Sequence, residues 1–291
     1  MKDICVRNLL LSYERYLIHE EKSDGTKEKY LRDVSRFLEW CAEHSVLAGG
    51  EKIEDILSVE LVAEWRDYLK QNGYAAITVN SMLGAVNSFL RFVGRNDCRA
   101  KYLRIQSRMF RREDRSLSRQ EYEVLKAEAE KQGRHRLKLL METICATGIR
   151  VSEVRFITVE AAAMRKTEIT LKGKIRTILI PKRLAKKLLK FCKKESIISG
   201  EIFLSKNKKS LSRKQIWAEM KALCIHSGIS DTKVFPHNLR HLFATTFYEM
   251  YQDIVRLADV LGHSCMDTTR IYLLTPEQDH IRQLERMNLV T

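Results

Sequence analysis

Residues 236–272 read PHNLRHLFATTFYEMYQDIVRLADVLGHSCMDTTRIY. Apolar residues recur through this stretch at helical spacing, and Pro236 and Gly262 interrupt the pattern, so the stretch predicts helices joined by short connections. Several of its side chains can bind phosphate, move a proton or act as a nucleophile: His237, Arg240, His241, His263 and Tyr272. Each of these residues alone would more often be structural than catalytic.

The composition around this stretch favours a mainly helical chain of two domains. The sequence has 291 residues with 44% apolar and 31% charged side chains, which is enough for packed cores. Only three prolines and 12 glycines occur in it, fewer than a fold rich in β-turns would need. We therefore expect long helices and few strands.

Charge indicates the class of partner. The 52 Lys and Arg residues exceed the 37 Asp and Glu residues by 15, which favours binding to a polyanion such as nucleic acid. The alternative is a generally basic surface that binds nucleic acid without specificity. Charge alone does not identify a reaction.

Cysteine usage and hydropathy predict a cytoplasmic location. The seven cysteines are an odd number and contain no metal-ligand spacing, so we expect reduced, buried thiols. The sequence shows neither a signal peptide nor an apolar run of about 18 residues. No membrane association is expected.

The first part of the chain predicts a helical bundle and then a linker. Apolar periodicity over residues 1–98 indicates four helices, with Ser58 before the third and Asn72-Gly73 after it. Residues 99–116 lose the periodicity and are strongly basic, as a linker lying along a polyanion would be. A solvated basic loop is the alternative for this segment.

Residues 117–291 predict a second domain. Ser118 and Glu121 form a capping-box pattern that opens a helix to about residue 132, and a second helix covers about 134–146. Residues 147–150 break that helix and lead into another. Alternating residues over 167–180, with Gly173 at the turn, predict a hairpin, the one clear β element. The helical pattern then resumes.

Five motifs in order resemble those of the tyrosine recombinase (phage integrase) family. They are TGIRVSE at 147–153, a lysine at the hairpin tip, HNLRH at 237–241, LGH at 261–263 and a tyrosine nine residues later. The chain resembles the compact, Xer-like members. The resemblance implies a core-binding, SAM-like helical domain over 1–98 and a catalytic domain over 117–291. The catalytic residues that it implies are Arg150, Lys172, His237, Arg240, His263 and Tyr272.

The chemistry of such a site explains these residue types. Cleaving a phosphodiester without metal requires stabilising a dianionic pentavalent phosphorus, and the guanidinium groups of Arg150 and Arg240 suit its oxygens. The Tyr272 hydroxyl has an ordinary pKa near 10, so it needs a base, which we assign to His237. Attack would form a 3′-phosphotyrosine, from which strands rejoin without ATP.

Other residues are assigned supporting roles. In the family a hairpin lysine protonates the leaving 5′ oxygen, and we assign this role to Lys172. The family usually has Gly-Lys-Gly at the tip, whereas this chain has Lys172-Gly173-Lys174, so Lys174 is an alternative. His263 is expected to donate a hydrogen bond to a phosphate oxygen. Glu153 is expected to hold the site through a salt bridge.

We expect no metal and no cofactor. His237 and His241 have the spacing of a zinc helix, but Asn238 stands where the glutamate of HExxH would be. His241 is expected to buttress the site or to cap neighbouring structure.

The partners implied are double-stranded DNA with inverted half-sites and further copies of the chain, which would form a tetramer on DNA. The candidate DNA-binding residues are Lys27, Asn80, Lys174, Arg213 and Lys214. A terminal helix over 277–284 would dock on its own domain or on a neighbouring copy. The predicted activity is integration, excision, inversion or dimer resolution by site-specific recombination. Supercoil relaxation, a catalytically inactive DNA-binding regulator and a metal-dependent nuclease are the alternatives.

Overall fold

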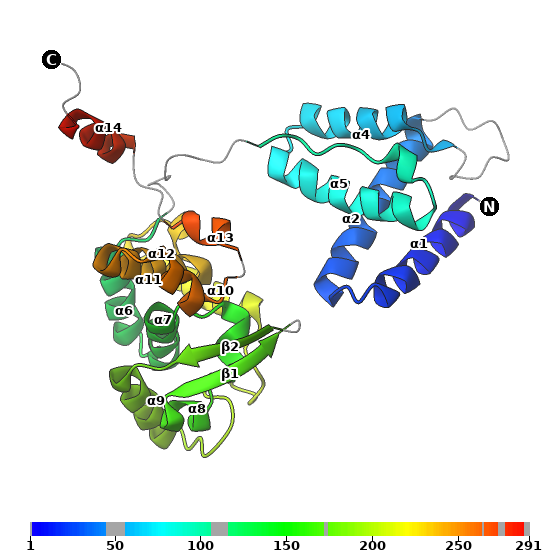
Figure 1. Cartoon of the computed structure of the whole chain (residues 1–291). Coiled ribbons are helices and arrows are strands. Elements are labelled where there is room, and N and C mark those ends of the chain that lie inside the picture. Colours follow the sequence, from blue (N-terminus) through cyan, green and yellow to red (C-terminus); the bar gives the residue numbers. More distant parts are fainter. Residues whose placement is uncertain are drawn as a thin grey trace. The chain divides into compact units, whose positions relative to one another are not determined.

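The computed structural model describes residues 2–44, 56–105, 116–171, 174–263, 265–272 and 277–287. The chain divides into two compact units, residues 1–107 and 108–291, drawn from blue to red in Figure 1. Both units consist mainly of helices, which confirms the predicted fold class. The domain limits at residues 98 and 117 stay predictions.

The described residues of the first unit contain four α-helices, in line with the periodicity. They are α1 (Lys2–His19), α2 (Asp24–His44), α4 (Val59–Gln71) and α5 (Ala76–Phe92), followed by the short 3₁₀ helix η1 (Asn96–Cys98). Ser58 caps α4 because its Oγ accepts a hydrogen bond from the Leu61 backbone N–H at 3.1 Å. The predicted start signal is therefore confirmed.

Helix α5 lies at the centre of the first unit. Its residues Leu83 and Phe89 are fully buried and pack with Tyr13, Phe37 and Trp65 from the other helices. Two of its asparagines also bind the chain that follows: the Asn87 side chain exchanges hydrogen bonds with the backbone of Ala100, and Asn80 does so with Leu103. Residues 99–105 of the predicted linker therefore run along α5, and residues 106–115 lie outside the described residues.

The second unit contains helices around one hairpin. Its elements are α6 (Arg119–Lys131), α7 (His135–Thr147), η3 (Val151–Phe156), α8 (Val159–Met164), β1 (Lys166–Leu171), β2 (Lys174–Leu179), α9 (Lys182–Lys194), α10 (Arg213–Ser227), η4 (Asp231–Lys233), α11 (Pro236–Tyr251), α12 (Ile254–Leu261), α13 (Asp267–Arg270) and α14 (Glu277–Arg286). The Ser118–Glu121 capping box at the start of α6 is confirmed. The further helix expected after residues 147–150 is the 3₁₀ helix η3.

Strands β1 and β2 form the predicted hairpin. They pair antiparallel from Lys166 opposite Leu179 to Leu171 opposite Lys174. Ile169 and Ile178 turn into the core, at 2% exposure each, so one face of the hairpin is buried. In the described part of the chain this is the one sheet, besides two isolated bridges.

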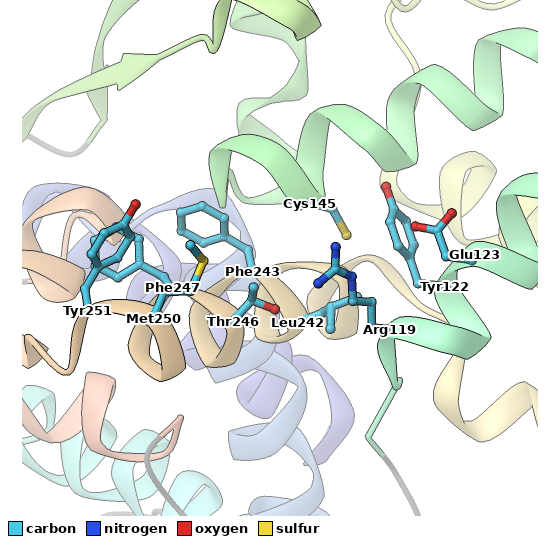
Figure 2. A pocket seen from close by; sticks show the side chains of 10 residues that line it. All are labelled: Arg119, Tyr122, Glu123, Cys145, Leu242, Phe243, Thr246, Phe247, Met250 and Tyr251. Carbon is cyan, nitrogen blue, oxygen red and sulfur yellow. The ribbon is translucent and has the colours of Figure 1, made fainter.

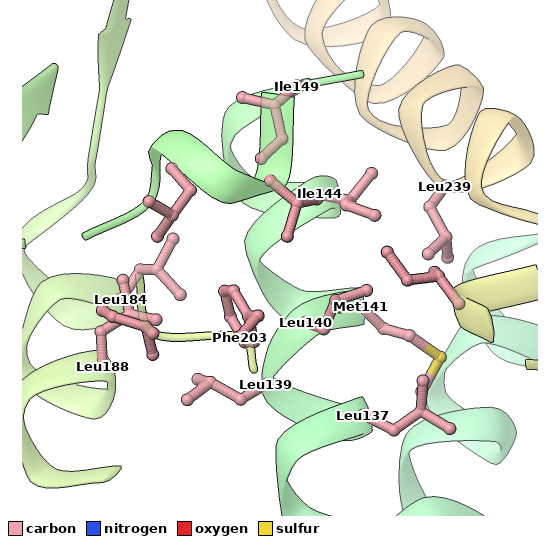
Figure 3. Packing of buried hydrophobic residues seen from close by; sticks show 14 of the residues in the cluster. Leu137, Leu139, Leu140, Met141, Ile144, Ile149, Leu184, Leu188, Phe203 and Leu239 are labelled. Carbon is pink, nitrogen blue, oxygen red and sulfur yellow. The ribbon is translucent and has the colours of Figure 1, made fainter. Parts of the chain in front are cut away.

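Helix α7 runs through the core of the second unit. Figure 3 shows Leu140 and Ile144 between Leu184 and Leu188 of α9 on one side and Leu239 of α11 on the other. The helix ends at Gly148 in the left-handed conformation (φ 63°), which turns the chain toward Arg150. The packing of α7 thus fixes where the TGIRVSE motif emerges.

Two further expectations concern cysteines and membranes. The six cysteines whose side chains are described form no disulfide. Cys145 and Cys224 are half-buried and Cys265 is exposed, so the expectation that all are buried is wrong at these positions. Among the described residues, no helix has the length and apolar character needed to cross a membrane.

Candidate active site

Four segments of the second unit meet around one buried arginine. They are the end of α7 with Arg150, the first turns of α11 with His237 and Arg240, the end of α12 with His263, and Tyr272 after α13. Helix α12 ends at Gly262 in the left-handed conformation, as α7 ends at Gly148. The helix ends present backbone carbonyls, because the last carbonyls of a helix lack partners within it.

The Arg240 side chain occupies the centre of this arrangement and is 2% exposed. Its guanidinium donates to the carbonyl oxygens of Gly148 and Leu261, the latter at 2.9 Å, and to Nε2 of His263 at 2.8 Å. Burial, with the nearby charge of Arg150, lowers the pKa of Arg240 to about 10, so the side chain stays cationic at pH 7. A cation is therefore held in place by both helix ends.

These contacts fix the tautomer of His263. A guanidinium can only donate, so Nε2 of His263 accepts and the ring proton lies on Nδ1, 2.8 Å from the Thr269 hydroxyl. Burial, together with Arg240 and Arg150, lowers the pKa of His263 to about 4. The ring is neutral at pH 7 and stacks on the Tyr272 ring with centroids 6.0 Å apart.

Arg150 gives the site an accessible cation. Its side chain is 43% exposed, and Nη2 lies 3.5 Å from the Gly262 carbonyl oxygen. Nη1 donates to Glu153 at 2.9 Å, and the Arg150 backbone N–H donates to the other oxygen of the same carboxylate at 2.8 Å. Glu153 is thus placed as predicted, in a salt bridge that orients Arg150.

The sequence analysis missed Arg176, a second partner of Glu153. Arg176 lies on β2, its side chain is 9% exposed, and it donates to Glu153 at 2.6 Å and to the Val260 carbonyl oxygen at 2.8 Å. Its Cδ lies so close to Gly262 that a Cβ there would come within 2.4 Å. Arg176 therefore links the hairpin to the TGIRVSE motif, through Glu153, and to the end of α12 just before the LGH motif, through Val260. The alternation of residues in β2 predicts on which face of the strand Arg176 lies. No local sequence pattern predicts that its partners are Glu153 and Val260.

His237 lies in the first turn of α11 and its side chain reaches the surface. Desolvation by its neighbours, with the positive charges of Arg240 and Arg150, lowers the pKa of His237 below the usual 6.5. The ring is consequently neutral at pH 7 and able to accept a proton.

Tyr272 is 4% exposed and belongs to a small apolar cluster with Ala244, Leu257 and Leu261. Its ring also lies against His241, with centroids 5.1 Å apart. The predicted buttress and the predicted nucleophile are therefore neighbours, and the tyrosine is covered by the side chains around it.

The predicted hairpin lysines are only partly placed. Lys172 lies outside the described residues. Lys174 begins β2, with its backbone opposite Leu171. The proton donor is thus not decided between them.

Of the other candidates for DNA binding, Arg213 and Lys214 are exposed in the first turn of α10, which begins at a Ser212–Gln215 capping box. Lys27 forms an ion pair with Asp24 at 2.8 Å. The contacts of Asn80 with the Leu103 backbone explain Asn80 without DNA. The DNA-binding roles of all these residues stay predictions. The described residues contain no group of His, Cys, Asp and Glu able to hold a metal ion.

A cavity of about 400 Å³ lies beside α11. Figure 2 shows that Arg119, Tyr122 and Cys145 line one side and Phe243 and Met250 of α11 line the other. None of the six predicted catalytic residues lines this cavity.

Comparison with known proteins agrees with this geometry. Residues 115–278 match the phage integrase family, and residues 10–96 match the phage integrase N-terminal SAM-like domain. The chain therefore belongs to the phage integrase family, as the motifs predict.

Two relatives and one solved structure illustrate the relationship. Tyrosine recombinase XerA of Pyrococcus furiosus is 30% identical over 298 aligned positions, which cover 100% of this chain and 98% of that protein. Tyrosine recombinase XerD of Vibrio cholerae is 26% identical, over 86% of this chain and 85% of that protein. A lambda integrase dimer bound to a COC′ core site has a similar fold, with a TM-score of 0.69, 18% identity, and coverage of 91% of this chain and 94% of that one.

Proposed function

We propose that this chain is a site-specific DNA recombinase of the tyrosine type that cuts and rejoins strands without a metal ion. The observation that carries the proposal is the buried contact of Arg240 with His263, which stacks on Tyr272, beside the accessible Arg150. One buried cation, one accessible cation, a neutral histidine and a phenol are the groups that a metal-free phosphoryl transfer needs. Membership of the phage integrase family and the names of its relatives support the same reaction.

In the proposed first step, Arg150 and Arg240 bind the non-bridging oxygens of the scissile phosphate. Their roles differ, because Arg240 is held by two carbonyls and a histidine while Arg150 is exposed and free to swing onto a phosphate. Glu153 and Arg176 limit that motion through the shared carboxylate. Arg150 is therefore the arginine that first meets DNA.

Tyr272 then attacks phosphorus. The Tyr272 oxygen forms a bond to phosphorus, its proton passes to His237, and the bond from phosphorus to the 5′ oxygen breaks. Lys172 or Lys174 gives the leaving oxygen its proton. The product is a 3′-phosphotyrosine, and the 5′ hydroxyl of another strand reverses the step. Since Tyr272 is 4% exposed, its segment must shift before the hydroxyl reaches a phosphate.

His263 has a role in two stages. Its Nε2 accepts from Arg240 and cannot donate to a phosphate at the same time. A bound phosphate brings negative charge, which favours protonation of His263 and lets Nε2 donate to a phosphate oxygen, the role that the sequence analysis assigned.

We propose duplex DNA with inverted half-sites as the substrate, a tetramer as the assembly on paired sites, and the cytoplasm as the location. The net charge of +15 suits a DNA partner. Lys27, Asn80, Lys174, Arg213 and Lys214 are the candidates for DNA contact, with Arg213 and Lys214 the two whose exposure fits best.

The test is covalent trapping in EDTA. Purified protein is incubated with nicked duplexes cut from DNA that flanks its own gene, and adducts are resolved on a denaturing gel. Tyr272→Phe must abolish an adduct at the 3′ phosphate, whereas Tyr251→Phe, an exposed tyrosine of α11, must preserve it. An adduct that persists in Tyr272→Phe, or cleavage that EDTA abolishes, would contradict the proposal. Full binding without any adduct on a broad set of nicked duplexes would favour a DNA-binding regulator.

A further inference from the structure

Helix α9 presents a dense row of cations on a part of the second unit that the proposed reaction does not use. Figure 1 shows α8 and α9 at the end of this unit opposite to α12 and α13. All basic residues of α9 are exposed, and α9 contains no Asp or Glu. These cations are Lys182, Arg183, Lys186, Lys187, Lys190, Lys193 and Lys194.

The other face of α9 is committed to the core. Leu184 and Leu188 are 5% and 0% exposed and pack with α7 and α8, and Cys192 is buried beside them. A helix that binds a membrane inserts its apolar face into the lipid, and this face is already covered. The surface that α9 offers to a partner is therefore cationic and not amphipathic.

The spacing of the lysines makes them a linear array. Lys182, Lys186, Lys190 and Lys194 are four residues apart, so they lie above one another over about 18 Å of helix. Like charges at this spacing repel, and cations in the first turn oppose the helix dipole. In the described part of the chain only Lys187 of α9 has a carboxylate partner, Glu142 at 2.8 Å. Within the described residues, none of the four lysines of the array therefore forms an ion pair.

We propose that the outer face of α9 is a second, sequence-independent contact surface for the phosphate backbone of duplex DNA. Duplex DNA carries a negative charge about every 1.7 Å along its axis, so the stripe spans several phosphates. Because α9 lies at the opposite end of its unit from the candidate active site, a short duplex at that site leaves the stripe free for another DNA segment. The inference takes from the proposed function only that DNA is the partner.

The test measures the salt dependence of binding to a long duplex without a recombination site. The slope of log K against log salt is negative, and each lost phosphate contact lowers its magnitude by about 0.9. The variant with Lys182→Gln, Lys186→Gln, Lys190→Gln and Lys194→Gln should therefore lose about 2 to 4 from the slope. The matched control changes the same four lysines to arginine, keeps the charge, and should keep the slope. Thermal melting should show the glutamine variant no less stable, since repulsion within α9 is removed.

An unchanged slope in the glutamine variant would overturn the proposal. Loss of binding to vesicles of phosphatidylglycerol with an unchanged DNA slope would also overturn it and assign the surface to lipid. The adduct assay on short nicked duplexes separates this inference from the proposed function, because adduct yield should be equal in the glutamine and arginine variants. Failure of the wild-type chain to form any adduct would count against the recombinase reaction and leave the slope experiment intact.

Discussion

Replacing Glu153 by Gln tests whether one buried carboxylate holds the site together. Glu153 is 1% exposed and accepts from the side chains of Arg150 and Arg176 at 2.9 and 2.6 Å. Glutamine has the same shape but only one acceptor oxygen. Its NH₂ group would face whichever guanidinium the oxygen does not, donor against donor.

The magnitude follows from the exposure of the two partners. Arg176 is 9% exposed, so it is left as a buried cation without its counter-charge, for which about 3–5 kcal/mol is typical. Arg150 is 43% exposed and can turn to water, so its half of the network adds little. Since the glutamine oxygen retains one hydrogen bond, we expect Glu153→Gln to lower the free energy of unfolding by about 3 kcal/mol, the low end of that range. For a domain of this size class this corresponds to a fall in Tm of about 6–12 °C.

The assay is urea unfolding of wild type, Glu153→Gln, Arg176→Met and the double variant. The double variant should be less destabilised than the sum of the singles, because removing Arg176 removes the uncompensated charge. Adduct formation should also fall about tenfold to hundredfold in Glu153→Gln, since Arg150 loses its orientation. A stability loss below about 1 kcal/mol, or strict additivity, would refute the reasoning.

Three further predictions concern the helix end, pH and metal. Gly262→Ala should lower the free energy of unfolding by about 2–4 kcal/mol, because the new Cβ would lie 2.4 Å from Arg176 and φ is +64°. The control Gly94→Ala, with φ +78° and open space around the Cβ, should lower it by only about 1 kcal/mol. Equal losses in urea unfolding would disprove the contact. The pKa of His263 is about 4 in the folded chain and 6.5 for an ordinary histidine, so on acidification the unfolded chain takes up the proton first. The free energy of unfolding should therefore fall, by up to about 1.4 kcal/mol per pH unit, as pH drops from 6.5 to 4. His263→Gln should flatten that part of the profile, and a profile with unchanged slope would contradict the assignment. EDTA should leave the rate of adduct formation unchanged, and a rate restored by added magnesium after chelation would indicate a metal-dependent reaction.

The elements that the sequence predicts correctly are those with local signals. Ser58 and Ser118 cap their helices within three residues, and the two alternating segments pair as the antiparallel strands β1 and β2. The further helix expected after Arg150 is present as the six-residue 3₁₀ helix η3. The sequence did not predict which kind of helix it is, because a 3₁₀ helix and a short α-helix can share the same capping pattern. Local chemistry decides where an element starts more firmly than which helix follows.

The site was predictable to the extent that its residues belong to motifs. Arg150, His237, Arg240, His263 and Tyr272 come from distant parts of the chain, and their order matched a known family. Contacts outside the motifs were not predictable: Asn80 bonds to Leu103, 23 residues away, and Arg176 reaches Val260 across 84 residues. Such partners depend on how the elements pack, which no periodicity expresses.

The position of Arg176 gives the hairpin a mechanical role in the proposed reaction. Arg176 binds Glu153, which orients Arg150, and it also binds the Val260 carbonyl at the end of α12, just before His263. The same strand begins at Lys174, two residues before Arg176, and Lys172 lies four residues before Arg176. DNA bound by a lysine at the hairpin tip could shift the hairpin. Because Arg176 contacts both Glu153 and α12, such a shift would move both of them together. In the proposed reaction, the candidate proton donors on the hairpin and the proposed phosphate clamp would then be coupled through the buried guanidinium of Arg176.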